Sequence, residues 1–225
     1  DYSTPAHHVI VENCKWWNMG ANGNNDQLKI SGLDDFIIRD CVFWNGADGG
    51  SMVDMVGCHN GEIINNSFIG AGSNAVQAKG GTARIRIAGN FFYNCGHRAI
   101  NAGGSTGLDY FRPIDAPYES ADLLIHSNIF MHAITPVGFV GTTGTLFVQN
   151  TVYLPEKWAF RILQETVGER FEPCGKNVVV NNIFYLNESS VNPIVNIGPD
   201  TEPETFIFKN NLWFNESDPD WNDIN

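Results

Sequence analysis

A short pattern of apolar and polar positions recurs eight times along the chain. In each copy an apolar run is followed by a polar or small residue, usually Asn, and two positions later by a bulky apolar residue. The polar or small positions are Cys14, Cys41, Asn66, Asn90, Asn128, Asn150, Asn182 and Asn211, with successive spacings of 27, 25, 24, 38, 22, 32 and 29 residues. A repeat of about 20 to 50 residues is typical of solenoid proteins.

The residues of the repeat predict strands, because β-branched and aromatic side chains dominate it. One repeat is too small to bury its apolar face, so neighbouring repeats must stack and share a core. Strands stacked in this way lie about 4.8 Å apart, which lets successive Asn side chains pass amide hydrogen bonds along a ladder. The bulky residues would stack inside as a second ladder: Trp16, Phe43, Phe68, Phe92, Phe130, Val152, Phe184 and Trp213. The sequence therefore predicts an all-β parallel solenoid.

With these two ladders, the chain resembles the right-handed parallel β-helix proteins of the pectate-lyase type over almost its whole length. The resemblance implies a single-stranded right-handed parallel β-helix of about eight coils. The length of 225 residues fits one domain, residues 1–225, and 23 Gly residues suit its many bends. Solenoids need polar caps, and neither end of the sequence carries an amphipathic helix, so we expect a segment of a longer protein.

Composition narrows the choice of partners. The net charge of −12 and the lack of a basic cluster argue against nucleic acid. We expect no membrane span, because no apolar run reaches the roughly 18 to 20 residues that a bilayer requires, and no signal peptide opens the chain. Cys14 and Cys41 occupy ladder positions, so we expect buried core thiols. The five cysteines form no CxxC pair, which predicts no cysteine metal site.

A second set of short strands follows the bends of the repeat. If their apolar residues point inward, the residues between them face outward, because side chains alternate along a strand. One outward column then contains Lys29, Asp54, Gln77, Asn101, Gly138 and Arg161, and the next contains Ser31, Val56, Lys79, Gly103, Val140 and Leu163. Polar groups in register on a flat sheet would suit an extended polymer. The alternative is a solvated face with ordinary cross-strand ion pairs.

Two insertions, residues 103–119 and 164–174, flank the same face. Binding groups concentrate in loops on a rigid scaffold. The first insertion combines Tyr110 with Arg112, which would suit stacking on a sugar ring and pairing with a carboxylate. The alternative is that its aromatic residues only fasten the loop to the sheet. His97 and Arg98 precede the fourth outward strand, where His97 could donate a proton near neutral pH.

The strand Val76–Gly80 resembles the lysine-bearing strand of the β-helical polysaccharide lyases that cleave alginate and dermatan-type chains. The resemblance implies that Lys79 takes the proton from C5 of a uronic acid while Arg98 or Arg112 offsets the carboxylate charge. One turn on, this chain has Asn101 and Gly103 where that family places Arg, and residues 72–75 lack its acidic calcium ligands. We therefore predict no metal ligands and no firm cofactor, and leave calcium open.

These patterns favour a carbohydrate-active protein, secreted or on a bacterial cell surface, that acts on an acidic polysaccharide by lyase-type β-elimination. The predicted catalytic residues are Lys79, Arg98 and Arg112, and the predicted substrate-binding residues are Lys29, Asp54, Gln77, Asn101, Tyr110 and Arg161. A glycoside hydrolase, which needs grouped carboxylates, is less supported, since Asp54 is the only acid in the two columns. The opposing hypothesis is a noncatalytic glycan-binding, adhesin or structural β-helix. The sequence leaves the oligomeric state open.

Overall fold

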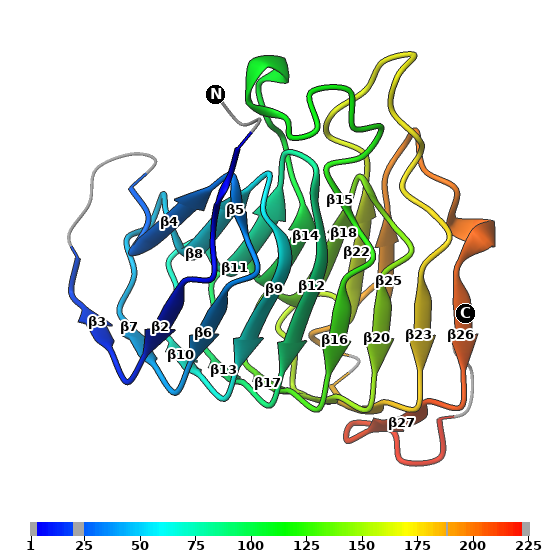
Figure 1. Cartoon of the computed structure of the whole chain (residues 1–225). Coiled ribbons are helices and arrows are strands. Elements are labelled where there is room, and N and C mark those ends of the chain that lie inside the picture. Colours follow the sequence, from blue (N-terminus) through cyan, green and yellow to red (C-terminus); the bar gives the residue numbers. More distant parts are fainter. Residues whose placement is uncertain (1–3, 20–24, 188, 222–225) are drawn as a thin grey trace.

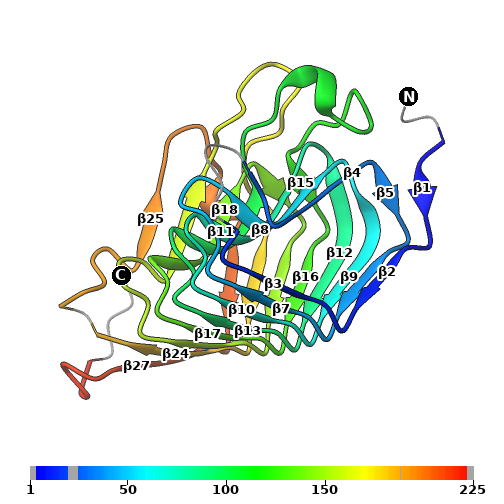
Figure 2. The ribbon, with the colours of Figure 1, turned by 90° about the vertical axis from the view of Figure 1, so that its left-hand side faces the viewer.

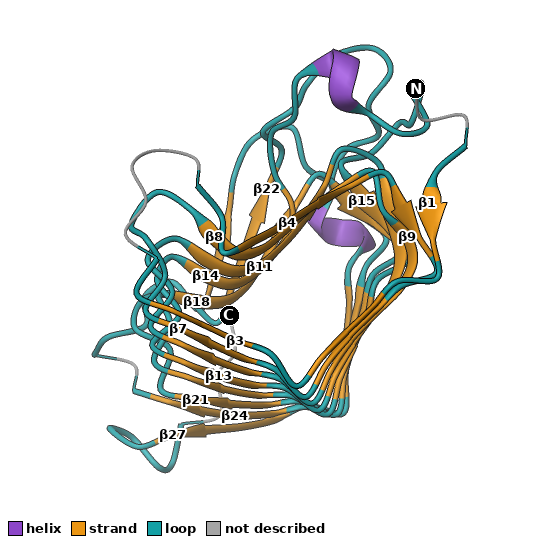
Figure 3. Cartoon of the chain, turned by 60° about the vertical axis from the view of Figure 1, so that its left-hand side comes forward, coloured by secondary structure: helices purple, strands orange, loops and turns teal. Residues whose placement is uncertain are grey.

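The computed structural model describes residues 4–19, 25–187 and 189–221, and it is a right-handed parallel β-helix of about eight coils (Figure 1). The predicted fold class is therefore confirmed. Every strand pair among the described residues is parallel and joins one coil to the next. Three sheets enclose a common interior (Figure 3). Each complete coil visits sheet C, then sheet A, then sheet B before returning to sheet C.

The bounds of the elements are as follows. Sheet C contains β4 (Leu28–Ser31), β8 (Ser51–Val56), β11 (Asn74–Lys79), β14 (Arg98–Gly103), β18 (Thr135–Val140), β22 (Phe160–Leu163) and β25 (Val195–Ile197). Sheet B contains β3 (Lys15–Trp17), β7 (Val42–Trp44), β10 (Ser67–Ile69), β13 (Phe91–Tyr93), β17 (Ile129–Met131), β21 (Thr151–Tyr153), β24 (Ile183–Leu186) and β27 (Leu212–Asn215).

Sheet A is the longest of the three. It contains β1 (Ala6–His7), β2 (Ile10–Glu12), β5 (Leu33–Asp34), β6 (Ile37–Arg39), β9 (His59–Ile64), β12 (Thr82–Ala88), β15 (Ser120–Ala121), β16 (Leu124–His126), β19 (Thr142–Thr143), β20 (Leu146–Val148), β23 (Val178–Val180) and β26 (Ile207–Lys209). Two short 3₁₀ helices, η1 (Leu108–Tyr110) and η2 (Pro203–Thr205), lie in connecting segments.

A ladder of Asn side chains runs along the bend between sheets A and B. Each amide nitrogen donates to the amide oxygen of the next Asn: Asn66 to Asn90 (3.1 Å), Asn90 to Asn128 (3.0 Å), Asn128 to Asn150 (3.0 Å), Asn150 to Asn182 (3.2 Å) and Asn182 to Asn211 (2.9 Å). The same oxygens accept backbone N–H groups of the preceding coil. A buried amide without partners would cost about 1–3 kcal/mol, so the ladder allows polar residues at an interior bend.

The predicted aromatic ladder is also present inside the solenoid. Trp16 stacks on Phe43 with ring centroids 4.6 Å apart, and the stack continues through Phe68 and Phe92 to Phe130 at spacings of 4.8–5.0 Å. Offset-stacked aromatic pairs contribute roughly 0.5–1.5 kcal/mol beyond the area they bury. Over these five coils one stacked ring per coil therefore stabilises the register of neighbouring coils. On the next coil Val152 occupies the same position.

The cysteines differ in burial. Cys41 is buried as predicted, but Cys14 is exposed, so its prediction was wrong. Cys14 lies on the first coil that the structure describes, and the described residues stack on it from one side. Burial raises the pKa of the Cys58 thiol to about 11 and that of Cys95 to about 12, so both are unreactive thiols near neutral pH.

Both long insertions begin where a sheet C strand ends, and both lie at the same edge of the solenoid. The segment after β14 and the segment after β22 rise side by side where sheet C meets sheet A (Figures 1 and 2). They overhang this end of sheet C and so place loop residues beside its outward columns. Among the described residues, no helix is long and apolar enough to cross a membrane.

Candidate functional site

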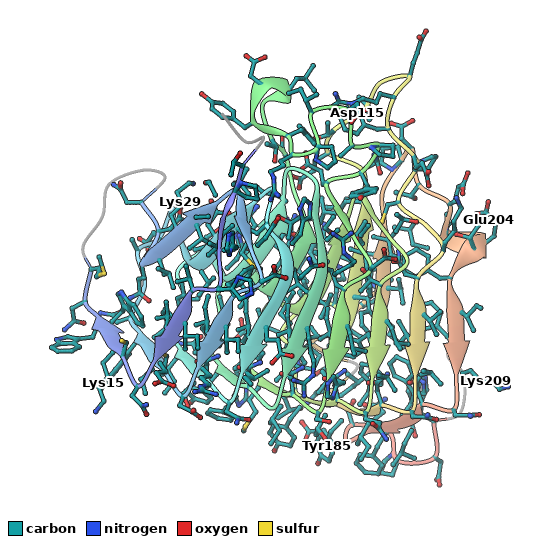
Figure 4. All side chains as sticks on the ribbon, viewed as in Figure 1. Lys15, Lys29, Asp115, Tyr185, Glu204 and Lys209 are labelled. Atoms are coloured by element: carbon teal, nitrogen blue, oxygen red, sulfur yellow. The ribbon has the colours of Figure 1, made fainter. Side chains whose placement is uncertain are left out.

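The first outward column is assembled by the parallel register of sheet C. Lys29 pairs with Asp54, Asp54 with Gln77, Gln77 with Asn101, Asn101 with Gly138, and Gly138 with Arg161. These residues come from six consecutive coils, which brings them into one row as the alternation of the strands predicts. Figure 4 shows Lys29 on β4 and Asp115 on the insertion that rises at the same edge.

Asp54 is the buried centre of a charged cluster. Its side chain has 0% exposure, and its Oδ2 atom lies 2.6 Å from Lys29 Nζ and 3.5 Å from Lys79 Nζ. Its Oδ1 atom has no hydrogen-bond partner among the described residues. Burial raises the pKa of Asp54, while the neighbouring charges of Lys79 and Lys29 oppose the rise. Asp54 therefore positions the two ammonium groups, rather than presenting its own oxygens to solvent.

The two lysines differ in the number of carboxylates that they contact. Lys29 Nζ contacts both Asp54 and, at 3.2 Å, Oδ2 of Asp26. Partial burial lowers the pKa of Lys29, but the hydrogen bonds and charges of Asp54 and Asp26 outweigh it, so the pKa is raised. The only ion pair of Lys79 in the described chain is the 3.5 Å contact with Asp54. An ammonium group has three donors, so Lys79 has donors left for a ligand.

An open hollow of about 480 Å³ lies above these lysines. It is lined by Lys29, Ser31, Val56, Lys79, Ser105, Thr106, Gly107 and Tyr110. Tyr110 belongs to η1 of the first insertion and is 62% exposed. The structure thus brings Tyr110 and the two lysines to one hollow, and it presents an aromatic ring beside a cationic floor.

Gln77 and Asn101 lie beside this hollow, beneath the start of the insertion. A Cβ added at Gly104 would lie 2.6 Å from Gln77 Nε2, so the backbone passes close over the Gln77 side chain. Gln77 Oε1 accepts a hydrogen bond of 3.1 Å from Ser51 Oγ. Asn101 is only 2% exposed, and its Oδ1 accepts a 3.0 Å hydrogen bond from Arg98 Nη1. Asn101 therefore holds Arg98 and has little surface for a ligand.

Arg98 and Arg161 line a second hollow on the same sheet. Its volume is about 230 Å³, and its lining is His97, Arg98, Ile134, Lys157, Trp158 and Arg161. Arg98 Nη2 lies 3.2 Å from Glu165 Oε1. The two hollows together bring five cations, Lys29, Lys79, Arg98, Lys157 and Arg161, to one face of a chain with net charge −12. The carboxylates paired with these cations are Asp26, Asp54 and Glu165.

Arg112 lies outside both hollows and forms an ion pair with Asp34. Its Nη1 and Nη2 atoms bind Asp34 Oδ1 and Oδ2 at 2.7 and 2.6 Å, and Nη1 also donates to the Gly57 carbonyl at 2.9 Å. The hydrogen bond from Arg112 lowers the pKa of Asp34. Arg112 lines neither hollow. In this structure it fastens the insertion to Asp34 and to the turn after β8.

Glu119 is a site residue that the sequence reasoning missed. It is 1% exposed, and its carboxylate accepts hydrogen bonds from Gly80 N (2.8 Å), Thr106 N (2.9 Å), Thr106 Oγ1 (2.7 Å) and the hydroxyl of Thr166. These donors belong to the turn directly after Lys79 and to both insertions. A charged residue directly before a short strand is too common a pattern to have indicated this role.

A calcium site does not fit the described residues. No three of their His, Cys, Asp and Glu side chains gather in a group that could hold a metal ion. The two acids nearest the lysines are Asp26 and Asp54, and both are committed to Lys29. The resemblance to calcium-dependent lyases therefore lacks its ligand set here.

A larger and more apolar hollow of about 780 Å³ lies on the outer face of sheet B. It is lined by Lys15, Trp16, Trp17, Asn18, Val42, Trp44, Asn45 and Ile69. Trp17 is 60% and Trp44 is 58% exposed. Exposed aromatic rings can also bind sugars, so this surface of sheet B is an alternative glycan-binding site to the face of sheet C. It lacks the cluster of cations that distinguishes the sheet C face.

No protein-family model and no curated protein sequence matches the chain. Among solved structures, it is similar to a double mutant of the tailspike protein of E. coli bacteriophage HK620, with a TM-score of 0.61 and 12% identity over 92% of this chain and 37% of that one. A second tailspike double mutant, in complex with a pentasaccharide, matches with a TM-score of 0.50 and 11% identity over 94% and 44% of the two chains. The exopolygalacturonase of Thermotoga maritima matches with a TM-score of 0.48 and 14% identity over 90% and 53%.

The chain spans less than half the length of either tailspike structure. At these identities the similarity shows the fold alone. The chain therefore shares the β-helix architecture of the phage tailspike.

Proposed function

We propose that this protein binds an acidic polysaccharide along the outer face of sheet C. The observation that carries the proposal is the Lys29–Asp54–Lys79 cluster at the floor of an open hollow, with exposed Tyr110 at its side. A buried carboxylate fixes two ammonium groups, and one of them, Lys79, keeps donors for a ligand carboxylate. The aromatic ring would pack against the apolar face of a sugar.

The charge distribution supports an anionic ligand rather than a neutral one. The face carries more cations than carboxylates, although the chain as a whole is acidic. Such a local field raises the concentration of an anionic ligand at the site. The similar fold of a tailspike structure in complex with a pentasaccharide is consistent with an oligosaccharide ligand. A polysaccharide ligand implies that the protein acts outside the cell or at the cell surface.

Lyase-type β-elimination is the second candidate function. It is favoured by Lys79, which faces the hollow and is held more loosely than Lys29. In this reaction Lys79 as the free amine takes the C5 proton of a uronic acid, and the electron pair of that C–H bond forms the C4–C5 double bond. The bond from C4 to the leaving oxygen breaks, and the leaving oxygen takes a proton from water. Arg98, on the next coil, would offset the carboxylate charge that builds up. The contact of Lys79 with Asp54 is the geometry of an ion pair, which suits binding of an anionic group better than proton removal, so binding remains the primary proposal.

The proposal is tested by calorimetric titration with polygalacturonate, alginate and glycosaminoglycans. We expect Lys79→Met to lower the affinity for the bound glycan about tenfold, which equals about 1.4 kcal/mol. Lys209→Met is the matched control, because it removes an exposed lysine from sheet A. Equal binding by Lys79→Met and the wild type, or loss of binding in Trp44→Ala instead, would overturn the proposed site.

The same samples separate the two candidate functions. Ultraviolet absorbance from new unsaturated chain ends reports β-elimination directly. A rise with the wild type that is lost in Lys79→Met would establish the lyase. Binding without such a rise would assign the protein to noncatalytic glycan binding.

A further inference from the structure

The hollow beside Arg98 is built around a glycine. A Cβ added at Gly138 would lie 2.7 Å from Arg98 Cδ, 3.1 Å from Arg98 Nε and 3.3 Å from Asn101 Oδ1. Gly138 is not among the glycines with a positive φ. The backbone here would therefore accept alanine, and glycine is needed because the side chain of Arg98 lies directly over β18.

The path over Gly138 brings Arg98 toward Arg161, two coils further on. Arg98 starts on β14, crosses β18 and reaches Glu165 beyond β22. Burial and the positive charge of Arg98 lower the pKa of Arg161, while Glu165 partly opposes them. Glu165 forms its ion pair with Arg98, and no ion pair of Arg161 is present among the described residues. The Nε atom of Arg161 is buried and has no hydrogen-bond partner within the described part of the chain.

Trp158 and Lys157 complete the hollow. The guanidinium carbon of Arg161 lies 4.8 Å from the centroid of the Trp158 ring, and Lys157 Nζ lies 4.4 Å from it. Cation–π contacts of this kind hold side chains in place without neutralising them. The hollow is therefore ordered by an aromatic wall and keeps an excess of positive charge: Arg98, Arg161 and Lys157 against Glu165.

We infer that the Arg98–Arg161 hollow is a second anion subsite that binds a carboxylate or sulfate group of the same glycan chain that Lys79 holds. This inference rests on the proposed function. Guanidinium groups match oxyanions through paired N–H donors, and an anion between Arg98 and Arg161 would relieve their mutual repulsion.

The distance between the two subsites restricts the ligand class. Lys79 lies on β11 and Arg161 on β22, three coils away. Steps of about 4.8 Å per coil separate them by roughly 14 Å. A single acidic sugar is too short to reach both subsites. The ligand is therefore an oligosaccharide or polysaccharide whose acidic groups recur along one chain, lying across the coils.

The first test compares short and long uronate oligosaccharides by calorimetric titration. We expect the wild type to bind a hexasaccharide at least about tenfold more tightly than a disaccharide, because only the longer chain reaches both subsites. Arg161→Gln and Gly138→Ala should remove this gain and leave disaccharide affinity within about twofold. Lys79→Met should weaken both ligands. Unchanged hexasaccharide binding in both subsite variants would overturn the inference while leaving the proposed function intact.

Gly138→Ala retains every charge and displaces chiefly Arg98, with a smaller shift of Asn101, so it separates geometry from net charge. Gly46→Ala is its control, because an added Cβ there meets side-chain atoms at 3.4 Å or more. Thermal unfolding checks that each variant is folded, and Arg161→Gln provides an independent route if Gly138→Ala is not.

The second test uses inorganic sulfate and does not depend on glycan binding. Arginine Nε–H resonances in NMR spectra of the labelled protein should shift saturably with sulfate in the wild type and in Lys79→Met, but not in Gly138→Ala. Sulfate binding without any glycan binding would leave the anion subsite standing and reject the proposed function. A lack of saturable shifts in the wild type would reject the subsite.

Discussion

Lys79 Nζ lies 3.5 Å from Oδ2 of the fully buried Asp54, although the two residues are 25 positions apart in the chain. The contact is diagonal across two neighbouring strands, since Asp54 pairs with Gln77 and Lys79 pairs with Val56. It exists because one coil returns the chain to the same sheet. The candidate site is thus a product of the solenoid register rather than of a local motif.

The Asn ladder gives the first prediction. Asn128→Ala would leave Asn90 without the acceptor of its backbone and side-chain N–H groups. We expect the free energy of unfolding to fall by about 2–4 kcal/mol, because two or more buried donors lose their partner. Lys209→Ala, which removes an exposed side chain from sheet A, should change it by less than about 0.5 kcal/mol. Chemical denaturation measures both, and equal effects would contradict the ladder's role.

The ion pair of Arg112 with Asp34 gives a prediction on pH. Arg112 lowers the pKa of Asp34, so the ionised carboxylate stabilises the fold. This contribution is complete above the unfolded-state pKa of Asp34, near 3.8, and is lost as the pH falls through the lower, folded-state value. Arg112→Gln should lower the free energy of unfolding by about 1.5–3 kcal/mol near neutral pH. The difference from the wild type should shrink in acid.

Urea denaturation of both proteins between neutral and strongly acidic pH provides the measurement. A difference that stays constant, or that grows in acid, would show that Arg112 acts by packing alone. The same variant should keep its glycan affinity at neutral pH, because Arg112 lines neither hollow.

Glu119 gives a prediction on the insertions. Glu119→Gln replaces one carboxylate oxygen by a donor, so Gly80 N–H or Thr106 N–H would face an amide nitrogen. Loss of one buried acceptor costs about 1–3 kcal/mol, and we expect local opening of residues 104–118 to increase roughly tenfold or more. Hydrogen exchange by mass spectrometry measures this opening. Unchanged exchange in this segment would mean that Glu119 does not fasten it.

The parts of the site that lie on the repeated strands could be predicted from the sequence. The same bend position recurs in eight copies and is Asn in six of them, so aligning the copies predicted the solenoid and the row from Lys29 to Arg161. Contacts made outside the repeat were not predictable in this way. Arg112 finds Asp34 across 78 positions of sequence, and its partner depends on the path of an insertion that has no second copy.

The sequence pattern also did not predict which side chains on the outer face of sheet C are buried. Alternation predicted that Asp54 and Asn101 point away from the core, but it could not show that Lys29, Arg98 and the insertion cover them. The role of Gly138 was hidden for the same reason, since a glycine in an outward column gives no indication of the Arg98 side chain that crosses it.

Salt dependence gives a further prediction on the proposed binding. Exposed charges interact weakly beyond the Debye length of about 8 Å at physiological ionic strength. We therefore expect the affinity for an acidic glycan to fall as salt rises, and to fall less steeply in Arg161→Gln, which has one cation fewer. Titrations over a range of sodium chloride concentrations measure both slopes. An affinity independent of salt would indicate binding through aromatic stacking, as on the Trp17 and Trp44 surface.

The most direct test is the structure of the protein crystallised with an acidic hexasaccharide. We expect the glycan to lie across the coils on sheet C, with one acidic group at Lys79, a sugar beside Tyr110 and another acidic group between Arg98 and Arg161. A glycan seated on Trp17 and Trp44 of sheet B, with sheet C empty, would contradict it.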